Sequence, residues 1–359
     1  MKDLPKILQV CPKYFPSVGG LEEHVRNISE RLALHYDITV ATTDPTSTLP
    51  REETINNVKI LRFPSWAPNE AYYFSGKLKK YLSENSDKYT ILHAHSYHAF
   101  PALYTAQTKK DNKMIFTPHY HGSGHTWFRR LLLKPYKLFG KKIYDKADKI
   151  ITVSKFEKTL ILKDFDVAED KIVTIPNGID PEEFKDIIKT RKDHRTILSV
   201  GRLEEYKGMQ HLIRALPGLD SDVTVEIVGK GPYKTQLVNL AKKQGMTARV
   251  RFYQDLPRKE LLQKYADADV FVLLSNHEAF SIVVEEALAS KLPCIVARTS
   301  ALTEWVDNKN CYGIDYPIGL DQLAELLNNV MGKRANPTKL PTWNETAEKT
   351  EELYETCLI

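Results

Sequence analysis

Cysteine is scarce in this chain, and its cysteines are never spaced for pairing. The 359 residues contain four cysteines, none in a Cys-x-x-Cys pair: Cys11, Cys294, Cys311 and Cys357. So few scattered cysteines argue against a disulfide framework or a zinc ribbon and favour a reducing compartment. We therefore expect free thiols and a cytoplasmic protein.

Long hydrophobic runs are also missing. No apolar run approaches the roughly 20 residues that a membrane-spanning helix needs. The chain passes from Met1 almost directly into a strand-like segment, Lys6–Val10, so we expect no signal peptide. The composition, 42% hydrophobic and 27% charged, is that of a soluble globular protein.

Charge of one sign is not in large excess, since the formal net charge is only +5. Such a balance gives no reason to expect a nucleic acid partner. The distribution is uneven, however: residues 127–149 carry eight basic and two acidic side chains, with aromatic and leucine residues interleaved. A segment of this kind can lie on an anionic membrane surface. The alternative is a solvated helix that packs its apolar side inward.

Short β-branched runs alternate with helical patterns along the whole chain. We predict strands at residues 6–10, 38–42, 58–63, 91–95, 114–117, 149–153, 172–176, 196–200, 224–228, 250–253, 270–274 and 294–297. This alternation predicts doubly wound α/β domains, in which helices cover both faces of parallel sheets.

A turn followed by a polar stretch, near residues 177–195, predicts a domain boundary. A chain of this length suits two domains of roughly 150 to 200 residues. We predict domains at 1–180 and 181–340, and a C-terminal helix within 341–359 that packs back on a domain.

The most informative segment runs from Glu278 to Ala287. It places two carboxylates, Glu278 and Glu286, on either side of a predicted strand-to-helix turn. The amides of residues 280–283 would then be unpaired donors at a helix N-terminus, which favours bound anions. An anion held between two carboxylates suggests a ligand with a phosphate core and hydroxyl groups on both sides, such as a sugar nucleotide.

Glycine turns follow two other predicted strands. Gly19 and Gly20 precede a helical stripe, where backbone amides can approach a phosphate closely, although the G-x-G-x-x-G dinucleotide spacing is absent. In the second half, Arg202 follows a strand end directly and Lys207 lies five residues later. Two cations in such a loop suit a diphosphate, and the alternative is an ordinary charged surface loop.

Histidines are concentrated between residues 93 and 125, where six of the eleven lie. The spacings His93-x-His95 and His119-x-His121 raise the hypothesis of a metal site, since alternate residues of a strand share a face. Carboxylate ligands are almost missing nearby, so we favour a polar ring around His119 at a strand end, where a sugar would bind.

Taken together, these motifs resemble family 4 of the retaining glycosyltransferases. The resemblance covers nearly the whole chain and rests on Gly19-Gly20-x-Glu22, Ser154-Lys155, Pro176-Asn-Gly-Ile-Asp180, Gly201-Arg202-x4-Lys207-Gly208 and Glu278-x-Phe280-x5-Glu286-Ala287. It implies the GT-B fold, with two Rossmann-like domains and an active site in the cleft between them. It further implies a metal-independent hexosyltransferase with a nucleoside diphosphate sugar as co-substrate and no bound cofactor.

The resemblance also implies roles for individual residues. The catalytic set would be His119, Arg202, Lys207 and Glu278, with His119 at the donor sugar and the two cations on the diphosphate. The nucleotide-sugar set would be Gly19, Gly20, Arg202, Lys207, Phe280, Ser281, Ile282 and Glu286, with Glu286 at the ribose. Ser281 departs from the glycine that is usual in the family, and so adds a side chain near the donor. The C-terminal helix would pack on the first domain.

The reaction implied is transfer to an acceptor hydroxyl with retention of configuration. We favour front-face attack over Glu278 as a covalent nucleophile. Two alternatives share the fold: a sugar-nucleotide 2-epimerase and an inactive donor-binding partner subunit. Donor base (UDP, GDP or ADP) and acceptor are left open. The basic segment 127–149 raises the hypothesis of a lipid-linked or cell-envelope glycan acceptor and of a peripheral location at the inner membrane face.

Overall fold

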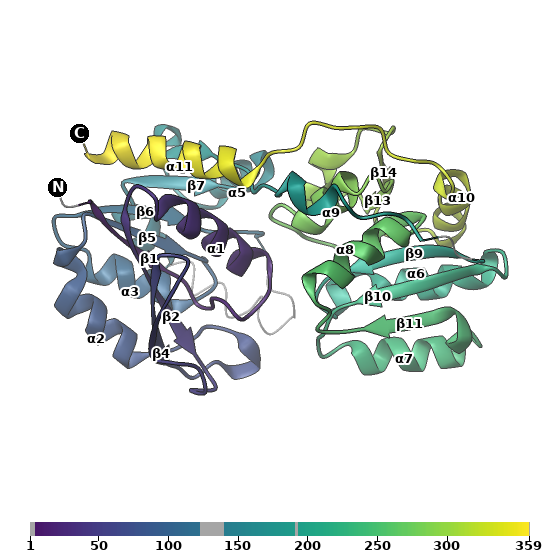
Figure 1. Ribbon diagram of the computed structural model, residues 1–359, viewed down its shortest axis with the longest axis horizontal. Coiled ribbons are helices and arrows are strands. Elements are labelled where there is room, and N and C mark those ends of the chain that lie inside the picture. The colour runs from purple at the N-terminus through teal and green to yellow at the C-terminus, as the bar shows by residue number, and fades with distance from the viewer. Residues whose placement is uncertain (1–3, 123–139, 191–192, 359) are drawn as a thin grey trace. The chain divides into compact units, whose positions relative to one another are not determined.

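The computed structural model describes residues 4–122, 140–190 and 193–358. The chain divides into two compact units, one formed by residues 1–177 with 343–359 and the other by residues 178–342 (Figure 1). The first is called the N-terminal unit and the second the C-terminal unit. Each has its own sheet and its own hydrophobic core.

The N-terminal unit is built on an eight-stranded sheet of order β3-β4-β2-β1-β5-β6-β7-β8. Its strands are β1 (Lys6–Val10), β2 (Asp37–Asp44), β3 (Glu52–Ile55), β4 (Val58–Pro64), β5 (Ile91–His95), β6 (Lys113–Thr117), β7 (Lys149–Thr152) and β8 (Ile172–Thr174). Only β3 runs antiparallel to its neighbour among these described strands.

Helices cover both faces of this sheet because successive side chains of its buried strands point to opposite sides. Ile7 of β1 packs with α1 (Gly20–Leu32) and α11 (Trp343–Leu358), whereas Leu8 and Val10 pack with α2 (Gly76–Asn85). The helices of this unit are α1 (Gly20–Leu32), α2 (Gly76–Asn85), α3 (Phe100–Thr108), α5 (Lys155–Asp164) and α11 (Trp343–Leu358). Residues 140–146 are also helical. Short 3₁₀ turns lie at Pro68–Glu70, Ser86–Lys88 and Glu169–Lys171.

The last helix, α11, belongs to the N-terminal unit although it follows the C-terminal unit in sequence. It packs along α1, and its buried residues Leu353, Tyr354 and Cys357 join the core beneath that helix. The burial of one face of α11 thus ties the end of the chain to its first strand and first helix.

The C-terminal unit is built on six parallel strands of order β11-β10-β9-β12-β13-β14. They are β9 (Arg195–Val200), β10 (Val223–Val228), β11 (Val250–Tyr253), β12 (Val270–Leu273), β13 (Cys294–Ala297) and β14 (Cys311–Ile314). The strand order reverses at β9, between β10 and β12. Such a switch point leaves a crevice at the carboxyl ends of the strands, where ligands of doubly wound sheets bind.

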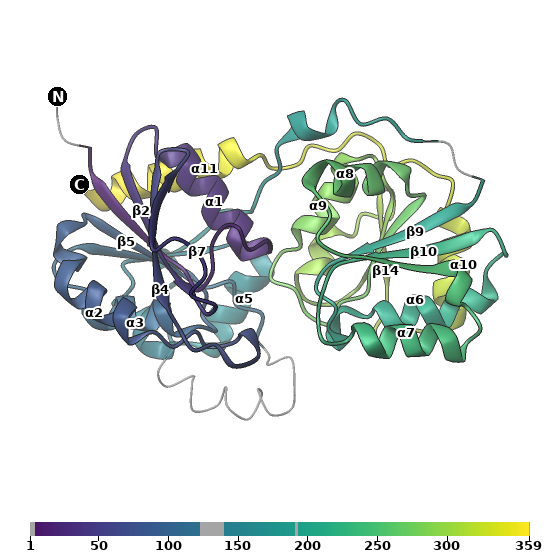
Figure 2. The ribbon, with the colours of Figure 1, turned by 60° about the horizontal axis from the view of Figure 1, so that its bottom comes forward.

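Its helices are α6 (Met209–Ala215), α7 (Lys234–Lys243), α8 (Arg258–Asp267), α9 (Ile282–Ala289) and α10 (Leu320–Val330). Right-handed crossovers place α6 and α7 on one face and α8 and α9 on the other, and α10 packs beside α6 (Figure 2). Short 3₁₀ turns lie at Pro181–Phe184, Glu205–Lys207, Leu216–Gly218, Thr247–Arg249 and Ser300–Trp305.

The prediction of parallel sheets covered by helices on both faces is confirmed, and each of the twelve predicted strands is present. Two strands escaped prediction. β3 is an antiparallel edge strand with exposed Glu52, and its short polar sequence looks like a loop. β14 is also an edge strand, and Gly313 in its middle weakens the strand signal.

No helix among residues 4–122, 140–190 and 193–358 is long and apolar enough to cross a membrane. Residues 123–139 lie outside the described residues. They include most of the basic and aromatic segment 127–149, so the membrane-surface hypothesis remains a prediction from sequence.

Candidate active site

Three loops meet at the carboxyl edge of the C-terminal sheet, after β9, β10 and β12. Their backbones approach so closely that glycine is required at two positions. A Cβ on Gly229 would lie 1.9 Å from the carbonyl oxygen of Gly201, and one on Gly208 would lie 2.3 Å from the carbonyl oxygen of Leu274. Both Gly229 and Gly208 also have positive φ angles, which glycine adopts without strain. These contacts fix the loop that carries the two predicted cations.

Lys207 and Glu278 form an ion pair within this loop cluster. The Lys207 Nζ lies 2.5 Å from Glu278 Oε1, and the two side chains are only 12% and 14% exposed. Burial alone would lower the pKa of Lys207, but the neighbouring Glu278 carboxylate and the Tyr206 ring outweigh it, and the pKa is raised. Lys207 therefore keeps its positive charge, and its carboxylate partner Glu278 lies in the same loop cluster.

Arg202 lies in the same loop but is positioned differently. Its side chain is 52% exposed, with Nη2 3.4 Å from Glu204 Oε1. Its positive charge acts on Lys207, opposing the rise in the pKa of that lysine. An exposed guanidinium beside a buried ammonium suits an anion that arrives from solvent.

The segment between Glu278 and α9 is held by the 3₁₀ turn Ser300–Trp305. The amide of Glu278 donates to Ser300 Oγ at 2.8 Å, and the Trp305 indole donates to the Phe280 carbonyl at 3.0 Å. Ser281 is the N-cap of α9, with φ 94° and ψ 77°, in the left-handed region that favours glycine. Its hydroxyl is buried and has no hydrogen-bond partner among the described residues. The first amides of α9, from Ile282 onward, begin four residues after Glu278.

Glu286, on α9, is held by two residues of α8. The guanidinium of Arg258 binds one carboxylate oxygen, and the hydroxyl of Tyr265 donates to the other at 2.9 Å. Arg258 also contacts Glu183 at 2.7 Å. Sequence reasoning missed Arg258 and Tyr265; the available signal was an arginine at the start of a helix that follows a strand end.

The neighbouring Glu285 is fully buried, and neither of its carboxylate oxygens has a hydrogen-bond partner among the described residues. Burial, reinforced by the negative charge of Glu286, raises the pKa of Glu285 well above its ordinary value. The neutral form of Glu285 is therefore favoured in the folded protein.

In the N-terminal unit, Gly19 and Gly20 begin α1. Gly19 is the N-cap, has an extended backbone with φ 177°, and offers no side chain to cap the helix. A Cβ there would lie 2.5 Å from a carboxylate oxygen of Glu22. The exposed amides at this end of α1 suit an anion, but Glu22 and Glu23 in the first turn compete with one.

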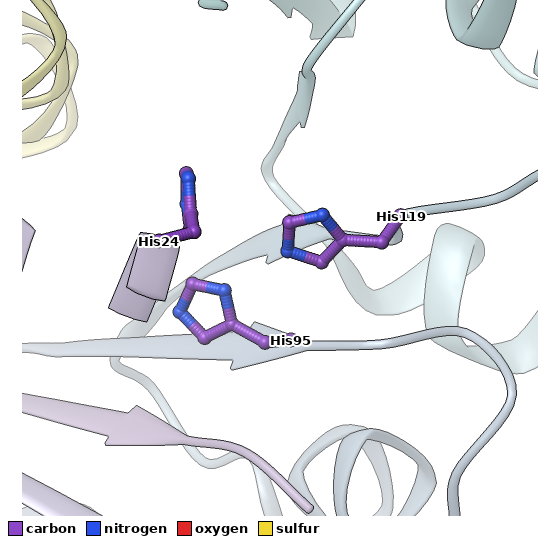
Figure 3. A group of neighbouring side chains, drawn as sticks. All are labelled: His24, His95 and His119. Carbon is purple, nitrogen blue, oxygen red and sulfur yellow. The ribbon is translucent and has the colours of Figure 1, made fainter. Parts of the chain in front are cut away.

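His119 follows β6 and adopts a positive φ of 48°. The structure gathers it with His24 of α1 and His95 at the end of β5 (Figure 3). Ring centroids of His24 and His119 are 5.0 Å apart, and those of His24 and His95 are 5.5 Å apart. His24 was not singled out from sequence, yet it lies three residues after Leu21 and four before Ile28, on the buried stripe of α1.

The two histidine spacings that raised the metal hypothesis do not give two chelating pairs, although the His93 and His95 ring centroids lie 4.2 Å apart. His93 hydrogen-bonds through both ring nitrogens, to Tyr354 Oη and Thr117 Oγ1, at 2.7 Å each. His121 stacks on His98, with ring centroids 4.5 Å apart, rather than joining His119. His125 lies outside the described residues. The predicted residues thus form two groups: His119, Gly19 and Gly20 in the N-terminal unit, and the others in the C-terminal unit.

Two family models match this chain. Glycosyltransferase Family 4 matches residues 18–183, and Glycosyl transferases group 1 matches residues 180–349. A glycogen synthase of Mycobacterium tuberculosis is 30% identical, covering 84% of this chain and 80% of its own. A GDP-mannose:cellobiosyl-diphosphopolyprenol alpha-mannosyltransferase of Komagataeibacter xylinus is 25% identical, covering 81% of this chain and 75% of its own. The chain belongs to glycosyltransferase family 4, and the protein is a glycosyltransferase.

Solved structures show the same fold. HepE of Anabaena, solved with UDP-glucose, gives a TM-score of 0.81 at 17% identity, with 98% of this chain and 99% of HepE covered. A sucrose-phosphate synthase of Thermosynechococcus elongatus gives 0.79 at 18% identity, with 99% of each chain covered. At this identity the likeness concerns the fold alone, and it confirms the predicted GT-B fold.

Proposed function

We propose that this protein transfers a hexosyl-type group from a nucleoside diphosphate sugar to an acceptor hydroxyl, with retention at the anomeric carbon. The observation that carries the proposal is the buried ion pair of Lys207 and Glu278, in the loop cluster that leads into α9. The ammonium group of Lys207 suits a diphosphate, and the carboxylate of Glu278 suits sugar hydroxyls. HepE, which shares the fold, was solved with UDP-glucose, and this supports a nucleotide-sugar donor.

In this proposal the diphosphate is bound by Lys207, Arg202 and the amides from Ser281 to Ile282. Lys207 and the helix amides are fixed before the nucleotide sugar binds, so they stabilise the charge that develops on the leaving diphosphate at little reorganisation cost. The exposed Arg202 adds a second cation. Gly19 and Gly20 would meet the donor phosphate from the N-terminal unit. We propose that no metal ion is needed, since the two cations and the helix amides supply the positive charge.

Glu286 would bind the ribose hydroxyls, and the structure suggests why it can do so. Arg258 and Tyr265 hold its two carboxylate oxygens in a fixed direction. A carboxylate held this way accepts hydrogen bonds from a ribose diol without first losing rotamer freedom. Glu278 would contact hydroxyls of the donor sugar, and His119 would contact the sugar near its reacting carbon.

The chemical step we propose is a front-face displacement. The bond between the anomeric carbon and the diphosphate oxygen breaks, and its electron pair leaves with the nucleoside diphosphate. The acceptor oxygen bonds to the anomeric carbon on the same face, and its proton passes to the departing phosphate. Glu278 pairs with Lys207 through Oε1, an arrangement that suits a hydroxyl-binding group better than a covalent nucleophile.

The acceptor we propose is a lipid-linked or cell-envelope glycan. Two observations support it: the basic and aromatic sequence 127–149, and the name of the Komagataeibacter xylinus relative, which includes a diphosphopolyprenol acceptor. A peripheral position at the inner membrane face would follow. Flotation with anionic vesicles at low salt tests this part, and absence of binding would remove it.

The donor is tested by calorimetry and thermal shift with UDP, GDP, ADP and their hexose conjugates in the presence of EDTA. We expect one nucleotide to bind wild type and to lose at least tenfold in affinity in Lys207→Ala. Lys189→Ala is the matched control, because Lys189 pairs with Asp269 at 2.7 Å beside the amino ends of the strands, away from the loop cluster. Equal losses in both variants, or no binding by wild type, would contradict the proposed diphosphate site.

Incubating the selected donor without acceptor distinguishes transfer from 2-epimerisation. A transferase leaves the sugar configuration unchanged or hydrolyses the donor slowly. Conversion of the donor to its 2-epimer, followed by NMR, would replace the proposed function with the isomerase alternative.

A further inference from the structure

The ring nitrogens of His24, His95 and His119 converge, and sugar binding does not explain this arrangement. One ring nitrogen from each histidine lies within 4.8 Å of those from the other two. His24 and His95 are 1% and 0% exposed, whereas His119 is partly exposed. Each also carries a buried ring nitrogen with no hydrogen-bond partner among the described residues: Nε2 of His24, Nδ1 of His95 and Nε2 of His119.

Hydrogen bonds made by the other ring nitrogen fix the tautomers of His95 and His24. The amide of Gln9 donates to Tyr354 Oη at 2.9 Å, so its Oε1 must accept, and it lies 2.7 Å from His95 Nε2. His95 Nε2 therefore carries the proton, and Nδ1 is a bare lone pair. In the same way His24 Nδ1 lies 2.7 Å from Asn177 Oδ1 and donates to it, which leaves Nε2 bare.

Burial disfavours a positive charge on all three rings. Burial lowers the pKa of His24 to about 4, although its bond to Asn177 acts in the other direction. Burial also lowers the pKa of His95 and of His119 well below the ordinary value, and the neighbouring histidines add to the effect. A cluster of neutral rings with inward lone pairs attracts an electrophile and repels an anion.

We propose that His24, His95 and His119 bind a divalent transition metal ion of the zinc type. Imidazole nitrogen suits Zn²⁺, Co²⁺ and Ni²⁺, whereas Mg²⁺ prefers oxygen ligands, which this cluster lacks among the described residues. Ligating histidines usually donate their other ring N–H to a carbonyl or carboxylate, as His24 and His95 do here. In a tetrahedral zinc site the ligand nitrogens lie about 3.3 Å apart, so modest ring rotations complete the geometry.

The site is formed by the N-terminal unit alone, and the transfer reaction proposed above does not call for this ion. His119, which follows β6, is the one partly exposed member of the three. Because His119 is also our proposed contact to the donor sugar, a bound ion would compete with that contact. Metal binding is measured without the sugar donor. A failure to bind metal would therefore not count against the proposed transfer reaction.

The test is titration of the metal-free full chain with Zn²⁺ by calorimetry, and with Co²⁺ by visible absorption. We expect one ion per chain, Co²⁺ bands of low coordination number, and no heat with Mg²⁺. His24→Gln and His95→Gln should each weaken Zn²⁺ binding at least tenfold. Asn177→Ala, which removes only the outer hydrogen bond of His24, should weaken it about 10- to 100-fold.

His35→Gln is the matched control, since the His35 side chain is 61% exposed and pairs with Glu351 rather than with a residue of this cluster. Thermal unfolding checks that each variant is folded. The proposal is overturned if wild type binds no Zn²⁺, or if binding is unchanged in His24→Gln and His95→Gln. Loss in His35→Gln equal to that in His95→Gln, with both folded, would also overturn it.

Discussion

The hydroxyl of Tyr354 on α11 accepts a hydrogen bond from the side-chain amide of Gln9 on β1, at 2.9 Å and across 345 positions of sequence. The same hydroxyl lies 2.7 Å from His93 Nδ1 on β5. All three side chains are fully buried. One hydroxyl thus joins the C-terminal helix to two central strands of the N-terminal sheet.

Tyr354→Phe should therefore destabilise the N-terminal unit. It leaves the Gln9 amide and a His93 nitrogen buried without a partner, at a cost of about 1–3 kcal/mol. Urea unfolding followed by circular dichroism measures the loss. Tyr316→Phe, at a tyrosine that is 46% exposed, is the control and should change little. Equal midpoints for the two variants would show that the α11 contact does not stabilise this unit.

Much of the fold could be predicted because buried parallel strands leave a strong signal. Runs such as Ile91–His95 and Cys294–Ala297 are buried on both faces and have the bounds predicted for them. The strands β3 and β14 could not be found, since edge strands bury less and so tolerate glutamate and glycine.

The candidate site was only partly accessible from sequence. Lys207 and Glu278 each stood out beside a strand end, but their pairing spans 71 positions and depends on two loops interlocking. Arg258 was not predicted as a site residue because its contact with Glu286 arises from the packing of two helices. His24 could have been found, since helical spacing puts it on the buried face of α1.

Ser281→Gly should stabilise the C-terminal unit. A serine at φ 94° is strained by roughly 1–3 kcal/mol, and its buried hydroxyl lacks a partner among the described residues. The greater freedom of glycine in the unfolded chain offsets part of this gain, so we expect about 1 kcal/mol. Ser290→Gly, at the other end of α9 with φ −76°, should destabilise instead. If the two variants shifted the unfolding midpoint equally, the claim that Ser281 is strained would be wrong.

Removal of the two cations should lower the rate of transfer far more than it lowers stability. If Arg202 and Lys207 stabilise the leaving diphosphate, each alanine variant should lose about 10²- to 10³-fold in kcat. Steady-state kinetics with the selected donor measure this, and Lys189→Ala should retain wild-type kcat. A change confined to KM would assign these cations to uniform binding of the donor rather than to its transition state.

Glu285 should make stability fall as pH rises. Burial, with the charge of Glu286, raises its pKa well above the ordinary value, so the folded protein keeps a proton that the unfolded chain loses above about pH 4.5. Its contribution is therefore complete below that pH and declines as pH rises toward the folded pKa, at about 1.4 kcal/mol per unit. Glu285→Gln, which mimics the neutral acid, should be more stable than wild type at pH 8 and similar near pH 4.5. Parallel stability curves for the two proteins from pH 4.5 to 8 would show that Glu285 is ionised in the folded state.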